Sequence, residues 1–245
     1  MLLLIAKSLR EDTGEGTGSG QIHGRKAYRS GGRASRVHTP ACRRFGLRGR
    51  VRVGSFDESF TTYAMHSRLA ELSERLAAER RVLLDVASTV PGDSWQTRPG
   101  GDRWSVSEIL QHLHQVEKSC AAVLAKRIAE ARDAGHPSEN ETGSVLGTLD
   151  HLRVSQHDRK LVAPERAQPA ENPDRATAER RLAESRAALL AAMESGDGLA
   201  LGEIRHTHLR FGELDLYQWC LFVAEHEKRH VTQLREVAAQ LAPAS

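Results

Sequence analysis

The sequence predicts an all-α protein, a four-helix bundle with one long crossover between its second and third helices. Four long stretches between residues 65 and 242 repeat their apolar residues with the period of an amphipathic helix. Between the second and third stretches, residues 134–172 are rich in Gly, Pro, Ser and scattered His without a clear period. No segment alternates convincingly as a strand would. Four long helices joined by one long connection are typical of a bundle with a crossover.

Residues 1–64 differ in composition from the rest of the 245-residue chain. They hold 12 of the 35 Lys and Arg residues but only 5 of the 32 Asp and Glu residues, a net charge of +7. Because this segment is rich in Gly, Ser and Arg and lacks an apolar period, we expect it to be disordered. It is interpreted as a basic arm for nucleic acid or membrane, or as a mis-assigned start with translation beginning near Met65. An organelle-targeting leader is a third interpretation, which the acidic residues of the segment oppose.

The remainder of the chain carries 23 basic and 27 acidic side chains, a net charge of −4. This balance gives little support to nucleic-acid binding by the predicted domain, residues 65–242. The cysteines Cys42, Cys120 and Cys220 are widely spaced and form no C-x-x-C motif. No run approaches the ~20 apolar residues that span a bilayer. We therefore expect a cytoplasmic protein without a membrane partner.

The first two helices are marked by their apolar period and by turn and capping residues. The first is predicted from Ser67 to about Val90, where a Pro-Gly-Asp turn ends it. The second opens at a capping box, Ser105 with Glu108 three residues later, and is predicted to run to about Asp133. The apolar face of the second helix is Val106, Ile109, Leu110, Leu113, Val116, Cys120 and Leu124.

The rest of the chain is predicted as a crossover followed by two more helices. The crossover, residues 134–172, is expected to hold one short helix near residues 145–154. An Asn-Pro-Asp sequence starts the third helix, which closes at a Ser-Gly-Asp-Gly sequence beginning at Ser195. A short segment then leads to the fourth helix, predicted from about Leu214 to Leu241.

Two histidines of the predicted fourth helix lie on its buried side. At ~100° per residue, His226 and His230 are one turn apart on the same face. Glu225, Lys228 and Arg229 are predicted to point toward water. The apolar residues that share the face of the two histidines are Leu216, Trp219, Val223, Leu234 and Val237. Because unpaired buried imidazoles are costly, the pair needs a polar partner, and a divalent metal ion is one such partner.

A third ligand could come from the second helix, which carries His112 and His114 on opposite flanks of its apolar face. His112 is somewhat nearer the centre of that face, but the period alone does not decide between them. Neutral imidazole is the usual ligand for zinc, nickel and iron. Three protein ligands with an open position are typical of a reactive metal site.

Two segments resemble a known family. The segment from Trp104 to Glu117 (WSVSEILQHLHQVE) resembles the second-helix motif of the DinB-like superfamily, the DNA-damage-inducible, metal-binding four-helix bundles. The sequence HLRFGELDLYQW from His208, with HEKRHVTQL from His226, is similar to the last-helix motif. The resemblance covers about residues 69–239. This chain has Leu209 where the family often has Pro, which affects the turn and not the ligands.

The resemblance implies one metal ligand from the second helix and two from the fourth, at His112, His226 and His230. It assigns no role to His114. The wider group includes transferases and isomerases that use low-molecular-weight thiols, and proteins described as metal-dependent hydrolases. We therefore expect a divalent ion, zinc or nickel first, a small-molecule substrate, and a thiol cosubstrate or water at the open position. Similar bundles often pair as homodimers, although the apolar pattern specifies no surface for pairing.

Two other functions compete with a metal-dependent transferase or hydrolase. The motif from His226 to His230 also satisfies H-E-x-x-H, in which Glu227 would be the general base of a zinc protease. That interpretation is disfavoured, because the only carboxylate downstream is Glu236, six positions on, and the longer protease motif is absent. Glu227 is otherwise a proton acceptor beside the metal or an ordinary surface glutamate. A non-catalytic metal-binding stress-response module is the second alternative.

Overall fold

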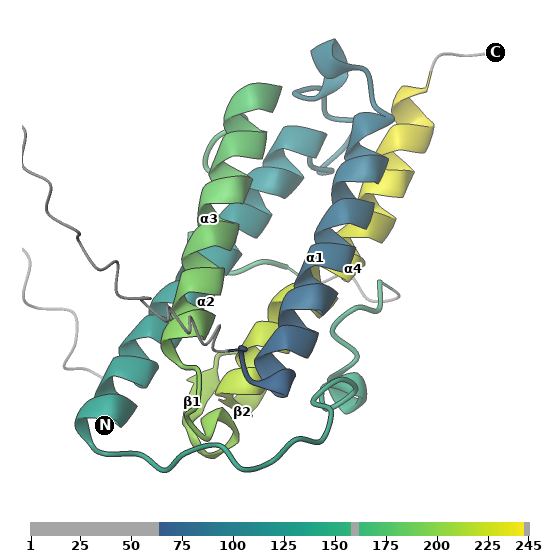
Figure 1. The fold of residues 1–245 in the computed structure, drawn as a ribbon. Helices are drawn as coiled ribbons and strands as arrows, with labels where there is room; N and C mark the ends of the chain where they lie inside the picture. The colour runs from purple at the N-terminus through teal and green to yellow at the C-terminus, as the bar shows by residue number, and fades with distance from the viewer. Residues whose placement is uncertain (1–63, 158–161, 243–245) are drawn as a thin grey trace, which may run out of the picture. The chain divides into compact units, whose positions relative to one another are not determined.

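The computed structural model describes residues 64–157 and 162–242 and shows the predicted all-α bundle (Figure 1). The predicted basic segment therefore lies outside the described residues, apart from its last residue. No helix in the described part of the chain is long and apolar enough to cross a membrane. The four long helices of the described part are α1 (Ser67–Ser88), α2 (Val106–Asp133), α3 (Arg175–Ser195) and α4 (Leu216–Leu241).

The helices pack as two close pairs, α1 with α4 and α2 with α3 (Figure 1). Helices α2 and α3 run in the same direction. Near their beginnings His114 donates a hydrogen bond to the Arg181 carbonyl, and near their ends Arg132 donates to the Ser195 carbonyl. The predicted long crossover makes this possible, because it returns the chain along the length of the bundle before α3 begins. Helix α2 also faces α4, which carries two of the predicted metal ligands.

The second helix begins as its sequence predicts. The Ser105 hydroxyl accepts a hydrogen bond from the Glu108 amide, and the Glu108 carboxylate accepts one from the Ser105 amide. Helix α4 opens with an equivalent capping box formed by Asp215 and Gln218. Because each box satisfies backbone N–H groups that the helix leaves unpaired, it defines where the helix starts.

The buried apolar residues form two clusters stacked along the bundle. On α2 one cluster ends at Leu113 and the other begins at Cys120, and on α4 the change occurs between Ala224 and Val231. Helices α1 and α3 change cluster over the same interval of the bundle. Buried or half-buried polar residues gather where the clusters meet, and they include His112, Glu117, His226, Glu227 and His230, with Glu79, Arg80, Ser185 and Arg186 from α1 and α3. A polar layer therefore divides the core.

The short helix expected near residues 145–154 is present only as a three-residue 3-10 helix. The structure has turns there and a single 3-10 turn, η2 (Asp150–Leu152). Gly147 has a φ of 82° and Arg153 a φ of 53°. Because both residues adopt the left-handed conformation, they interrupt a right-handed helix on either side of η2.

The expected absence of strands is wrong for the segment before α4. Two short strands, β1 (Arg205–His208) and β2 (Gly212–Asp215), form an antiparallel hairpin in which Arg205 pairs with Asp215. Only Leu214 among their eight residues is buried, so the sequence lacks the apolar alternation by which strands are recognised. The hairpin delays the start of α4 from the expected Leu214 to Leu216.

We expect Leu124→Ala to lower the free energy of unfolding by about 2–5 kcal/mol, because its fully buried side chain fills the core on α2. Urea denaturation measures the effect. The control is Leu209→Ala in the hairpin turn, where the side chain is 72% exposed, and it should change stability by less than about 0.5 kcal/mol. Equal effects of the two substitutions would contradict this description of the core.

Candidate metal centre

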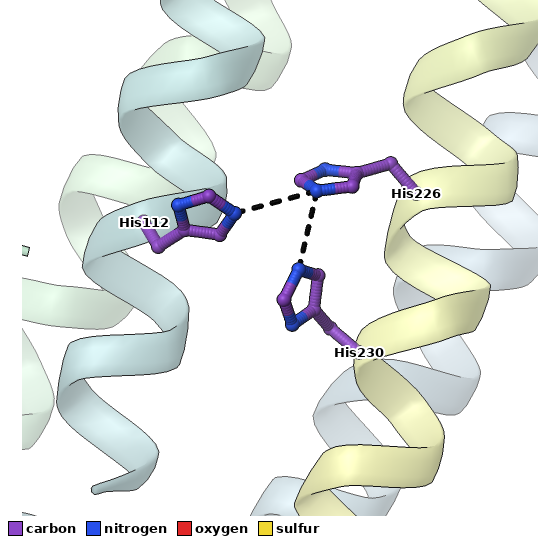
Figure 2. A group of neighbouring side chains, drawn as sticks. All are labelled: His112, His226 and His230. Carbon is purple, nitrogen blue, oxygen red and sulfur yellow. Dashed lines mark hydrogen bonds between the residues drawn. The ribbon is translucent and has the colours of Figure 1, made fainter. Parts of the chain in front are cut away.

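Three histidines from two helices meet in the polar layer (Figure 2). His112 on α2 faces His226 and His230 on α4, and one ring nitrogen of each lies within 4.8 Å of the other two. The Nε2 atom of His226 is 3.3 Å from Nε2 of His112 and 3.2 Å from Nε2 of His230. His112 and His230 are buried, and His226 is partly exposed. The structure therefore brings together the three residues that the family resemblance implied as ligands.

Hydrogen bonds on the far side of two rings determine which nitrogen carries the proton. Nδ1 of His112 lies 2.5 Å from the Ala167 carbonyl oxygen, and Nδ1 of His230 lies 2.7 Å from Oε1 of Gln233. Because these oxygens can only accept, each Nδ1 donates and each Nε2 is left with a lone pair. Both lone pairs are directed at His226. Metal-ligating histidines are commonly oriented in this way by a partner on the second nitrogen.

The cluster fits a divalent ion better than it fits three hydrogen-bonded rings. Nε2 of His226 can donate a proton to only one of its two neighbours, so at least one lone pair would lack a partner. Protonation is disfavoured, because burial and the neighbouring rings hold the pKa of His226 and His230 well below the ordinary value. Zinc–imidazole bonds of about 2.0–2.1 Å in a tetrahedral arrangement separate two ligand nitrogens by about 3.3 Å. The separations of 3.3 and 3.2 Å agree with that geometry.

His114, the alternative left open by the helical period, does not join the cluster. Its Nδ1 donates to the Arg181 carbonyl at 2.7 Å, so the ring faces α3. His112, which precedes His114 by two residues on α2, instead packs against Trp104, with ring centroids 5.0 Å apart. The choice between the two histidines depends on which neighbouring helix each flank of α2 faces.

Aromatic rings connect the cluster with the hairpin. The Phe222 ring stacks on the His226 ring with centroids 5.3 Å apart. It also contacts the His208 ring, with centroids 4.7 Å apart. Trp219 anchors the hairpin by donating from Nε1 to the His206 carbonyl. Burial, reinforced by Arg166 and Arg210, lowers the pKa of His208 to about 4, so this ring is neutral near pH 7. The hairpin thus adds a neutral imidazole and apolar rings beside the cluster.

One interpretation of the sequence expected Glu227 to be an ordinary surface residue, and this is wrong. It is buried, and its carboxylate accepts a hydrogen bond from Nε of Arg80 at 2.7 Å and lies 2.9 Å from Nη2 of Arg186. Burial raises the pKa of Glu227, and the two arginines oppose that effect. The same arginines bind Glu117, one and a half turns after His112. Because both oxygens of Glu227 face arginines, its position does not suit the general base of a protease.

Sequence reasoning missed this set of charges, and it also misplaced Arg229. That side chain was expected to point toward water, but the residue is only 7% exposed and donates a hydrogen bond to the Gln156 carbonyl of the crossover. Charged residues on the flank of an amphipathic helix usually face solvent, so the period of α4 could not show that the crossover covers this flank. A charged residue at a core-facing position, such as Arg80, was the one available signal.

A surface hollow in the described part of the chain is not lined by the three histidines. Its volume is about 620 Å³, and its lining from α2, α3 and the crossover includes Gln111, His114, Lys118, Arg166 and Arg181. The hollow therefore does not identify a substrate pocket at the candidate metal centre.

The lowered pKa values predict how the metal-free protein responds to acid. Burial lowers the pKa of His112 as well as those of His226 and His230. Below about pH 6.5 the unfolded chain binds protons that the folded chain does not, so stability should fall as pH decreases, by at most about 1.4 kcal/mol per pH unit for each histidine. Urea denaturation between about pH 7 and pH 5 measures the slope. His226→Gln should reduce it by roughly one histidine's share, and an unchanged slope would contradict the prediction.

Comparisons with known proteins identify the family of this chain. The family model of the DinB superfamily matches residues 75–234, which include all three histidines. An uncharacterized protein of Bacillus subtilis (strain 168), YuaE, is 27% identical over 149 residues, which cover 59% of this chain and 83% of that protein. No solved structure shows a significant match. Because the family model matches well over half of the chain, the chain belongs to the DinB superfamily.

Proposed function

We propose that this protein binds one divalent ion, zinc or nickel, through His112, His226 and His230 and uses it to transform a small molecule. The observation that carries the proposal is that Nε2 of His226 lies 3.3 and 3.2 Å from Nε2 of His112 and His230, separations suited to a metal ion, with lone pairs on His112 and His230 directed into the cluster. The proposed reactions are transfer to or from a low-molecular-weight thiol, and hydrolysis.

The protein's own groups would prepare the site before any substrate arrives. The Ala167 carbonyl and the Gln233 side chain hold two rings in the tautomer that presents Nε2. Phe222 packs against the third ring, so all three imidazoles are held in place without the ion. When bound, the ion would supply Lewis acidity and lower the pKa of a thiol or water brought to its open position. The neutral ring of His208 contributes no positive charge against the ion near pH 7.

A metal-binding module without catalysis is the alternative. Its site would have the same three ligands, so the ligands alone do not distinguish it from an enzyme. A rate that depends on the metal would favour the enzyme, and a tightly bound metal without any such rate would favour the module.

Metal content tests the proposed site. The full-length protein should carry about one equivalent of zinc or nickel per chain, and His112→Ala and His226→Ala should each lose it, because two imidazoles alone bind such ions weakly. Elemental analysis after gel filtration gives the ratio. His114→Ala is the matched control from the same helix, and it should keep the metal because its ring faces Arg181. Equal metal contents in all four proteins would argue against the site.

Activity tests the proposed chemistry. Purified protein is screened with low-molecular-weight thiols plus electrophilic acceptors, and separately with hydrolysable small amides and esters. A chelator should abolish any rate and zinc or nickel should restore it, whereas His230→Ala should lower the rate by more than about 100-fold. A rate unaffected by both the chelator and His230→Ala would show that the reaction does not use this site.

A further inference from the structure

Each of the four helices contributes one charged side chain to a buried ring in the polar layer. Arg80 from α1 binds Glu227 from α4, with Nε 2.7 Å from Oε1, and binds Glu117 from α2, with Nη2 2.9 Å from Oε2. Arg186 from α3 also bridges the two glutamates, with Nε 2.5 Å from Oε1 of Glu117 and Nη2 2.9 Å from Oε2 of Glu227. The ring is therefore closed, and its positive and negative charges alternate.

The ring is also tied to the helix backbones. Nη1 of Arg80 donates to the Leu182 carbonyl of α3 at 3.0 Å, and Nη1 of Arg186 donates to the Leu76 carbonyl of α1 at 2.7 Å. The side chains of the two glutamates are 2% exposed, and those of the arginines are 12% and 11% exposed. The planar guanidinium groups present donors in fixed directions, so they hold their partners at defined positions along the bundle.

Along both α2 and α4, the glutamate of the ring is close in sequence to the candidate metal ligands of the same helix. Glu117 follows His112 by five residues on α2, and Glu227 lies between His226 and His230 on α4. A shift of α2 along α4 by one residue would displace the ligands by about 1.5 Å. Metal–ligand distances tolerate only about 0.2 Å, so the register of these two helices must be held closely.

The apolar clusters alone specify that register weakly. Aliphatic side chains on either side of the layer can repack with modest loss when a helix shifts, whereas a closed set of buried ion pairs has few alternative arrangements. Because buried ion pairs are often no more stabilising than apolar residues of similar volume, stability by itself is a weak reason for four buried charges.

We infer that the ring of Arg80, Glu117, Arg186 and Glu227 is a positioning device that holds α2 and α4 in the register at which the three histidines converge. These four residues pair with one another and are not among the candidate metal ligands, so we assign them as positioning residues. The inference rests on the proposed function for its purpose, but the register itself can be measured without metal.

The experiment compares full-length Glu117→Gln and Glu227→Gln with wild type. Each substitution keeps the side-chain volume and removes one charge from the ring. Crystal structures of the metal-free proteins should show the Nε2 separation of His112 and His226 increased from 3.3 Å. Titration with Co²⁺ should show affinity lowered by about 10–100-fold and a changed visible absorption spectrum, as expected when the support of metal ligands is removed.

Glu108→Gln is the matched control. Glu108 is also a buried carboxylate of α2 paired with an arginine, but its partners, Arg98 and Ser105, belong to the adjoining loop and cap and not to another long helix. It should lower the unfolding midpoint and leave the Co²⁺ affinity and spectrum unchanged. A ring that only stabilises the fold would give this control result in all three variants, which would overturn the inference.

Two further outcomes remain decisive. If the glutamine variants do not fold, Arg186→Lys keeps the charge but removes the bridging fork, and wild-type Co²⁺ affinity and spectrum in that folded variant would overturn the inference. If wild type binds no Co²⁺, the proposed function fails, and the metal-free structures alone then test the register. In that case an unchanged separation between His112 and His226 in the variants overturns the inference, and an increased one supports it.

Discussion

The packing of α2 against α4 across a polar layer is the constraint on which the rest of the site depends. Two apolar clusters fill the bundle above and below this layer, and within it buried imidazoles, carboxylates and guanidinium groups need partners. Polar groups removed from water are costly unless they are paired, so the layer is tolerated only if each group has one. The positions of the four helices are thereby coupled to the chemistry between them.

The layer contains charged side chains and neutral imidazoles, and these two kinds of polar group differ in whether they find partners within the protein. The charged ring balances itself, because two arginines and two glutamates pair within the protein. The three histidines do not balance themselves, because Nε2 of His226 can donate to only one of the two lone pairs that face it. A divalent cation would complete that part of the layer, and this difference in satisfaction is the physical basis of the proposed function.

The irregular segments also contribute to the surroundings of the cluster. The crossover supplies the Ala167 carbonyl that orients His112 and covers the flank of α4 that carries Arg229. The hairpin holds Trp219 and brings His208 against Phe222, which in turn packs on His226. Neither segment has a strong pattern in the sequence, because its role consists of single contacts with distant residues.

The sequence by itself determined the fold class, the capping box at Ser105 and the pair His226 and His230 on one face of the last helix. These features are local, because the period of a helix and the residues of its first turn lie within a few positions of one another. His112 was identified through a family resemblance, while the period left His114 open. Only the tertiary structure decided which flank of α2 faces α4, that Glu227 is buried between two arginines, and that a hairpin precedes α4. A periodic pattern shows which side of a helix is apolar, but not which distant side chain will lie across from it.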